Sequence, residues 1–182
     1  RNDLKSKKPM NRLLQGDVSS GKTIVAILSS AIAVGNNFQV AIMAPTEILA
    51  RQHYLSFIGQ MNKAKVTCAL LIGNMKKKER TSIISGIKSN KIQIIIGTHA
   101  LIQEDVKFKK LNLVIIDEQH RFGVNQRASL VAKGENPNFL AMTATPIPRT
   151  LSITYNGDME LSIIDELPLN RIPITTKVIN PD

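Results

Sequence analysis

The sequence predicts an α/β fold in which helices cover both faces of a doubly wound, mostly parallel sheet. Three observations support this prediction. Short apolar runs recur along the chain, helical patterns separate them, and a phosphate-loop pattern joins the first run to the first helix. Continuous runs of Ile, Val and Leu are typical of strands that are buried on both faces of a parallel sheet.

Six apolar runs are the expected strands. In chain order they are RLLQ at 12–15, QVAIMA at 39–44, KVTCALLIG at 65–73, KIQIIIG at 91–97, LNLVIID at 111–117 and FLAMTA at 139–144. The patterns between and after them predict helices over Thr23–Val34, Glu47–Gln60, Lys76–Ile87, Asn125–Ala132 and Pro148–Tyr155. Polar breakers such as GNN at 35–37 separate the elements, as loops require.

The composition fits one globular domain with a polyanionic partner. The chain has 182 residues, of which 43% are hydrophobic, and this is enough for a packed core. Lys and Arg number 24 against 14 Asp and Glu, and the resulting net charge of +10 favours a polyanionic partner such as a nucleic acid, although surplus lysine can also mean only a soluble surface. Because only 4% of the residues are aromatic, we expect contact with backbone phosphates rather than stacking on bases.

The cellular compartment follows from what the sequence lacks. Cys68 is the one cysteine, so a disulfide framework is excluded and a reducing compartment is expected. It lies inside an apolar run, and we expect a buried, unreactive thiol. No apolar run approaches the roughly 20 residues that span a bilayer, and no signal peptide is visible. We therefore expect a cytoplasmic protein with no membrane partner.

The two ends of the sequence suggest a domain taken from a longer protein. A charged run precedes the first strand, and nothing before that strand would cover an edge of the sheet. Prolines at 168, 173 and 181 disfavour a helix near the C-terminus, where IPITTKVI is typical of an extended strand or linker. We expect the domain to occupy 1–167 and a linker to begin at 168 and run to 182.

The stretch GDVSSGKT matches the phosphate-loop pattern G-x-x-x-x-G-K-[ST]. It follows a short strand and opens a helix, which is the context that this pattern requires. The N–H groups of such a loop surround a β-phosphate at the helix N-terminus. We expect Lys22 to neutralise β- and γ-phosphate oxygens and Thr23 to ligate Mg²⁺. The nucleotide-binding residues are then Gly16, Asp17, Val18, Ser19, Ser20, Gly21, Lys22 and Thr23.

An acid pair follows the apolar run LVII. Asp117 and Glu118 come directly after it, at the carboxyl end of the expected strand. In a parallel sheet this end lies at the same edge as the phosphate loop. One carboxylate there holds the Mg²⁺ water shell, and a second orients or deprotonates the attacking water. We assign Asp117 to the metal and Glu118 to the base.

Threonines also follow three of the expected strands. Thr143 and Thr145, in MTATPIPRT, would place hydroxyl groups at the same edge of the sheet. Thr46 and Thr98 come where two Ile-rich strands end. Each of these two could cap the following helix, or its N–H group could bind a DNA or RNA phosphate, and the residues alone leave both readings open.

Two further groups of residues carry no functional prediction. His53 and His99 have no partners at metal-ligand spacing, so we interpret neither as a metal ligand. The lysine clusters at 76–78 and at 107–110 are typical of solvated faces.

The ordered set GDVSSGKT, APTEILA, GTHALIQ, DEQH and TAT resembles the first RecA-like motor domain of a superfamily 2 helicase. More narrowly, RLLQGDVSSGKT, DEQHRFGV and TATPIPRTL together resemble the RecG family of branched-DNA translocases. The resemblance runs from Pro9 to the end of the chain. The transcription–repair coupling factor Mfd shares HRFGV and TATPIPRTL, but it typically has Glu where this chain has Gln119 and lacks IDELPLNRIPITT, so RecG is favoured.

The resemblance implies a RecA-like, ATP-binding helicase domain over 1–167. RecG-like proteins are bacterial, ATP-driven motors that remodel stalled forks and Holliday junctions in recombination and repair. The family's motifs imply that Lys22 and Thr23 serve phosphate and Mg²⁺, and that Asp117 and Glu118 serve Mg²⁺ and water. They imply a coupling role, between nucleotide and DNA, for His120, Thr143 and Thr145, and contact with the DNA backbone for Pro45, Thr46, Gly97 and Thr98. They also imply that the strand FLAMTA lies between the phosphate-loop strand and the DEQH strand.

The resemblance further implies partners within the same polypeptide: a wedge domain before this segment and a second RecA-like domain after it. The second domain would supply arginines to the γ-phosphate, so we expect this segment alone to hydrolyse ATP very slowly. Other interpretations are a phosphate-loop kinase or transport ATPase, and a non-catalytic, nucleotide-dependent DNA-binding module. RecG-like loops usually read GDVGSGKT, so Ser19 replaces a glycine. If this position needs a positive φ, serine costs about 1–2 kcal/mol of strain.

Overall fold

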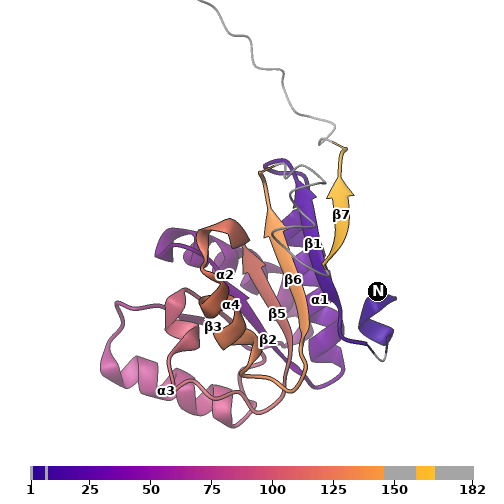
Figure 1. Ribbon diagram of the computed structural model, residues 1–182. Coiled ribbons are helices and arrows are strands. Elements are labelled where there is room, and N and C mark those ends of the chain that lie inside the picture. Colours follow the sequence, from indigo (N-terminus) through magenta and orange to yellow (C-terminus); the bar gives the residue numbers. More distant parts are fainter. Residues whose placement is uncertain (1, 7, 146–158, 167–182) are drawn as a thin grey trace, which may run out of the picture.

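The computed structural model describes residues 2–6, 8–145 and 159–166, and these form an α/β domain around a seven-stranded sheet (Figure 1). The order of the strands is β3-β4-β2-β5-β6-β1-β7, and every pairing is parallel. The strands are β1 (Asn11–Gly16), β2 (Gln39–Met43), β3 (Cys68–Leu71), β4 (Ile94–Gly97), β5 (Leu111–Asp117), β6 (Asn138–Thr143) and β7 (Glu160–Ile164). The sheet confirms the predicted fold class.

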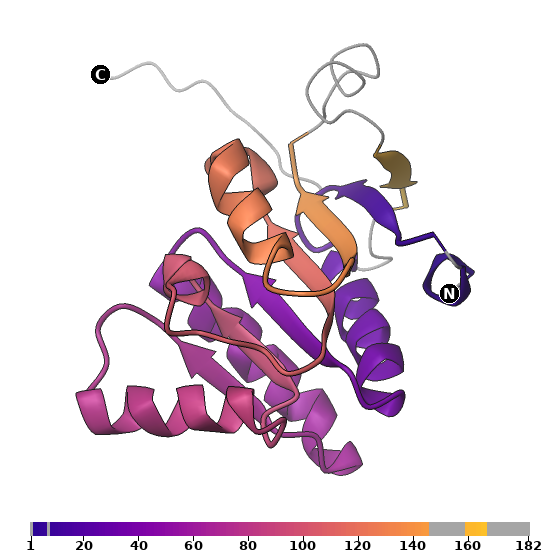
Figure 2. The same cartoon turned by 60° about the horizontal axis from the view of Figure 1, so that its bottom comes forward.

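Two helices cover each face of the sheet, as the predicted doubly wound fold requires (Figure 2). The helices are α1 (Lys22–Gly35), α2 (Glu47–Met61), α3 (Lys77–Lys88) and α4 (Val124–Val131). Successive residues of a strand point to opposite faces. Accordingly, Ile42 packs in the cluster that includes α1 and α2 side chains, whereas Ala41 packs in the cluster that includes Ile87 of α3 and Leu130 of α4.

The six predicted strands and the first four predicted helices are all present. Strands β3 and β4 are shorter than their apolar runs, because residues 65–67 and 91–93 lie outside the paired segments. The described residues also form four short 3-10 helices that the sequence did not predict. One precedes β1, at Asp3–Lys5, and the others follow α2, β4 and β5, at Asn62–Ala64, His99–Ile102 and Gln119–Arg121. The predicted helix at Pro148–Tyr155 and the predicted linker at 168–182 lie outside the described residues.

Strand β7 corrects the expectation that the sheet edge beside the first strand is uncovered. It pairs with β1 in parallel, from Arg12 opposite Glu160 to Gly16 opposite Ile164. Arg12 also forms ion pairs with Asp3 and Glu160 and donates a hydrogen bond to Ser162 Oγ at 2.8 Å. The strand was missed because none of its residues is fully buried, so it lacks the continuous apolar run that marks the inner strands.

The parallel arrangement brings the carboxyl ends of the strands to one edge. Gln15 of β1 lies opposite Thr143 of β6, and Asp117 of β5 lies opposite Met142. The strand FLAMTA therefore lies between the phosphate-loop strand and the DEQH strand, as the resemblance implied. The loops at this edge hold the residues that the sequence singled out.

Candidate active site

The phosphate loop joins β1 to α1 in a tight turn. Gly21 precedes the helix with φ 100°, a conformation that favours glycine, and no side-chain cap bonds to the first turn. The N–H group of Ser20 donates to the carbonyl of Asp17 at 3.1 Å, which closes the loop. The N–H groups of Ile24 and Val25 donate to the carbonyl of Gly21, at 3.0 and 3.3 Å. The N–H groups ahead of them, at the start of the helix, are the ones that an anion would meet.

Lys22 is turned back over the loop. Its Nζ donates hydrogen bonds to the carbonyl oxygens of Gly16 and Asp17, both at 2.7 Å. The ammonium group is thereby held at the mouth of the loop, which is where phosphate oxygens would meet it.

Gly16 and Ser20 show how closely the loop is built. A Cβ atom on Gly16 would lie 2.5 Å from Ser20 Oγ and 3.1 Å from Ile164 Cβ of β7, so a larger residue there would displace both neighbours. Ser20 Oγ is buried and has no hydrogen-bond partner among the described residues. A buried hydroxyl without a partner beside uncapped helix N–H groups fits a phosphate that would satisfy both.

Ser19 has φ 65°, so the position does adopt the left-handed conformation on which the strain argument depended. A non-glycine residue there is strained by about 1–2 kcal/mol.

The acid pair lies at the end of β5. Asp117 is buried, and its Oδ1 accepts a hydrogen bond from the N–H group of Glu118 at 3.1 Å. Glu118 has φ 49° and ψ 54°, a left-handed conformation that is uncommon outside glycine and that clusters at functional sites.

Glu118 meets two of the residues assigned to coupling. Thr143 Oγ1 donates to Glu118 Oε2 at 3.4 Å, and His120 Nδ1 lies 3.5 Å from the same oxygen. Thr143 is fully buried, and its Oγ1 accepts a hydrogen bond from the N–H group of Thr145 at 3.1 Å. The end of β6 is therefore tied to the carboxylate that we assigned as the base.

A hollow of about 350 Å³ adjoins this carboxylate. Its wall combines the start of α2 with the loops that follow β5 and β6, and it is lined by Pro45, Thr46, Leu49, Glu118, His120, Arg121 and Thr145. Two of the four residues expected to touch DNA thus share one hollow with Glu118 and with two of the coupling residues.

The four predicted DNA-contact residues differ in exposure. Thr46 is exposed and caps α2, because its Oγ1 accepts from the N–H group of Leu49 at 3.3 Å. Thr98 is only 2% exposed, its side chain caps no helix, and its N–H group donates to the carbonyl of Leu71 at 3.3 Å. The capping interpretation is therefore confirmed for Thr46 and wrong for Thr98, whose N–H group is already bonded.

Gly97 has a structural reason to be glycine. A Cβ atom there would lie 2.1 Å from the carbonyl oxygen of Leu71 on the neighbouring strand β3. Close backbone approach thus explains this residue without any ligand.

His53 is the residue that sequence reasoning missed. It belongs to α2, and its Nε2 lies 2.7 Å from Asp117 Oδ2 across 64 positions of sequence. No local pattern could have linked the two residues.

Among the described residues, no cluster of three or more His, Cys, Asp or Glu side chains could hold a metal ion. A Mg²⁺ site made of the Thr23 hydroxyl, the Asp117 carboxylate and phosphate oxygens needs no such cluster.

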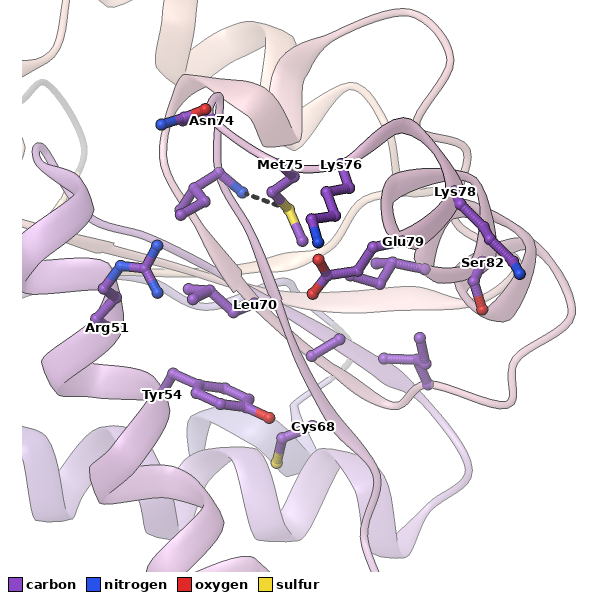
Figure 3. A pocket seen from close by; sticks show the side chains of 14 residues that line it. Arg51, Tyr54, Cys68, Leu70, Asn74, Met75, Lys76, Lys78, Glu79 and Ser82 are labelled. Atoms are coloured by element: carbon purple, nitrogen blue, oxygen red, sulfur yellow. Dashed lines mark hydrogen bonds between the residues drawn. The ribbon is translucent and has the colours of Figure 1, made fainter.

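A second hollow, of about 820 Å³, lies at the β3 edge between α2 and α3 (Figure 3). Tyr54 of α2 and Cys68 of β3 both line it, and burial raises the pKa of the Cys68 thiol to about 11. Met75 Sδ accepts a hydrogen bond from the N–H group of Ile72 at its rim (Figure 3). The lining of this second hollow includes none of the residues that we assigned to the nucleotide or to DNA.

Comparison with known proteins defines the class. The family model of the DEAD/DEAH box helicases matches residues 3–153, and the chain belongs to this family. No helix among the described residues is both long enough and apolar enough to cross a membrane.

Within that class the chain is similar to the helicases named RecG. It is 52% identical over 177 residues to the ATP-dependent DNA helicase RecG of Synechocystis and 51% identical over 182 residues to that of Thermotoga maritima. The alignments include 97% and 100% of this chain, but the chain spans only 21% and 23% of the length of these two relatives.

Solved structures give the same result. A structure of RecG bound to a three-way DNA junction matches 96% of this chain and 23% of that chain, with 49% identity and a TM-score of 0.82. The helicase domain of Hef from Pyrococcus furiosus matches 90% of this chain and 37% of that chain, at 20% identity and a TM-score of 0.67, and this likeness shows the fold alone.

Proposed function

We propose that this chain is the ATP-binding motor domain of a RecG-like translocase that remodels branched DNA in recombination and repair. The observation that carries the proposal is the meeting of the phosphate loop, the Asp117–Glu118 pair and Thr143 at one edge of the sheet. The RecG relative bound to a three-way DNA junction supports branched DNA as the substrate. ATP and DNA are both available in the bacterial cytoplasm, where we place the activity.

The proposed chemistry assigns one role to each group. Main-chain N–H groups from Gly16 to Thr23 hold the phosphates, and Lys22 exchanges its two carbonyl partners for phosphate oxygens. The Thr23 hydroxyl and the Asp117 carboxylate would hold Mg²⁺, which neutralises charge on the β- and γ-phosphates when bound. Glu118 accepts a proton from the attacking water as the oxygen of that water bonds to the γ-phosphorus and ADP leaves.

The proposed coupling uses the contacts around Glu118. His120 and Thr143 both approach its Oε2, and Thr145 is hydrogen-bonded to Thr143. Pro45 and Thr46 line the same hollow, at the start of α2, where a DNA backbone phosphate would meet the helix N-terminus. Hydrolysis of the γ-phosphate beside Glu118 would therefore affect residues that line the same hollow as the proposed DNA contacts.

We propose that the full-length protein also contains a wedge domain and a second motor domain, and that a linker at 168–182 leads to the second motor domain. The short share of the relatives' lengths that this chain covers supports further domains. We infer that residues 1–182 alone hydrolyse ATP very slowly, because an arginine supplied to the γ-phosphate contributes roughly 10³–10⁵ in rate in comparable systems.

The test is Glu118→Gln in the full-length protein. We expect DNA-stimulated ATP hydrolysis to fall by at least about 10²-fold, since a general base contributes that much, while ATP binding is retained. Glu135→Gln is the matched control, because Glu135 is exposed and lies in the loop before β6, at the opposite edge of the sheet.

Each alternative predicts a different outcome. If Glu118→Gln hydrolyses ATP as fast as the wild type, Glu118 is not the base. If the wild type binds ATP and DNA but shows no hydrolysis, the chain belongs to a non-catalytic nucleotide-dependent DNA-binding module. A kinase or transport ATPase would show no stimulation by DNA.

A further inference from the structure

His53 forms a close pair with Asp117, but the proposed function gives His53 no role. His53 Nε2 lies 2.7 Å from Asp117 Oδ2, and the two side chains are only 11% and 13% exposed. Such a short contact at a mostly buried site is a charge-assisted hydrogen bond, which is roughly twice as strong as a bond between neutral groups.

The direction of this bond follows from the chemistry of the carboxylate. An ionised carboxylate only accepts hydrogen bonds, so the proton must lie on His53 Nε2. The other oxygen, Oδ1, accepts from the N–H group of Glu118 at 3.1 Å. Each oxygen therefore has one donor, and each retains a lone pair for a further ligand.

These two donors come from different parts of the fold. His53 is held by α2, and the Glu118 N–H group is held by the left-handed turn after β5. A carboxylate bonded at both oxygens cannot rotate about its side-chain torsions without breaking one of these bonds. The plane of the Asp117 carboxylate is thus set by the packing of α2 against the end of β5.

We propose that His53 is a positioning residue, which orients the Asp117 carboxylate for the Mg²⁺ ion of the bound nucleotide. The inference rests on the proposed function, because that function assigns Asp117 to Mg²⁺. Partners behind metal-binding carboxylates fix the ligand orientation, and their removal typically lowers metal affinity or activity by about 10- to 100-fold. His53 would act through Asp117 rather than on the substrate or the metal.

The experiment uses the full-length protein and compares His53→Leu with His53→Gln. Nucleotide affinity is measured with a fluorescent ATP analogue as Mg²⁺ is titrated, and again in EDTA. We expect His53→Leu to raise the Mg²⁺ concentration at half-effect by about 10- to 100-fold, with unchanged affinity in EDTA. His53→Gln should stay close to the wild type, because its amide Nε2–H retains a donor.

Matched controls separate positioning from folding. Gln60→Leu introduces leucine at an exposed site on the same helix. It should leave the nucleotide affinity unchanged both with Mg²⁺ and in EDTA. Thermal unfolding of each variant reports its stability. If His53→Leu lowers affinity equally with Mg²⁺ and in EDTA, or if His53→Gln behaves like His53→Leu, the residue is structural and the inference is overturned.

Asp117→Asn separates this inference from the proposed function. If Asp117→Asn raises the Mg²⁺ concentration at half-effect but His53→Leu does not, the positioning role of His53 is overturned while the metal assignment of Asp117 stands. If Asp117→Asn leaves the Mg²⁺ dependence unchanged, Asp117 does not serve the metal, and both the metal assignment and the role of His53 are overturned.

Discussion

Lys22 Nζ donates a hydrogen bond to the carbonyl oxygen of Gly16 at 2.7 Å, so the lysine of the phosphate loop is bonded to the first residue of the same loop. A second bond of equal length reaches the carbonyl of Asp17. The ammonium group is thereby placed over the loop, where phosphate oxygens would take the place of these two carbonyls. The loop is therefore closed around its own cation.

Replacement of Ser19 by glycine tests the strain in this loop. Ser19 has φ 65°, and we expect the loop to keep this conformation both with and without nucleotide, so that its strain of about 1–2 kcal/mol largely cancels from the affinity. We predict that Ser19→Gly changes ATP affinity by less than about tenfold, or 1.4 kcal/mol, as measured by calorimetry. A larger gain would show that the bound loop is more strained than the free one.

Gly97 and Gly59 form a matched pair for stability. Gly97→Ala should destabilise the fold by about 1–3 kcal/mol or more, because the new methyl group would meet the Leu71 carbonyl at 2.1 Å. Gly59→Ala, inside α2 with open space around it, should stabilise by about 0.8–1 kcal/mol. Denaturant unfolding measures both changes, and equal effects of the two variants would contradict the packing argument.

Thr46→Asp separates helix capping from DNA contact. Aspartate caps a helix at least as well as threonine, so the midpoint of unfolding should not fall. The added negative charge at the exposed start of α2 would repel a phosphate, and we expect DNA affinity to weaken by about tenfold or more at low salt. Fluorescence anisotropy with a branched DNA measures this, and unchanged affinity would remove Thr46 from the DNA surface.

The thiol of Cys68 should react slowly. Burial raises its pKa to about 11, whereas a free cysteine has a pKa of about 8.5, so far less thiolate is present at pH 8. We predict that alkylation by iodoacetamide is about 100-fold slower than in the unfolded chain, and that its rate rises with pH up to the region of pH 11. Peptide mass spectrometry follows the reaction at this one residue. A rate that levels off near pH 8–9 would contradict the raised pKa.

The fold was largely predictable because its inner strands are buried on both faces. The apolar runs LNLVII and IIIG are typical of strands in a sheet that is covered on both faces, and in a parallel sheet their carboxyl ends share one edge. The meeting of the phosphate loop with Asp117 and Thr143 follows from that geometry. Strand β7 escaped prediction because it is half-buried beside β1, and half-buried strands carry a weaker apolar signal.

The sequence by itself determined six of the seven strands, the helices α1 to α4, the phosphate loop and the edge of the sheet where chemistry would gather, because these depend on short-range patterns of burial and spacing. Only the tertiary structure decided that His53 meets Asp117 across 64 positions, that Thr98 is buried and bonded to β3, and that β7 completes the edge beside Gly16. These contacts depend on how separate elements pack, and such packing leaves no local trace in a single chain.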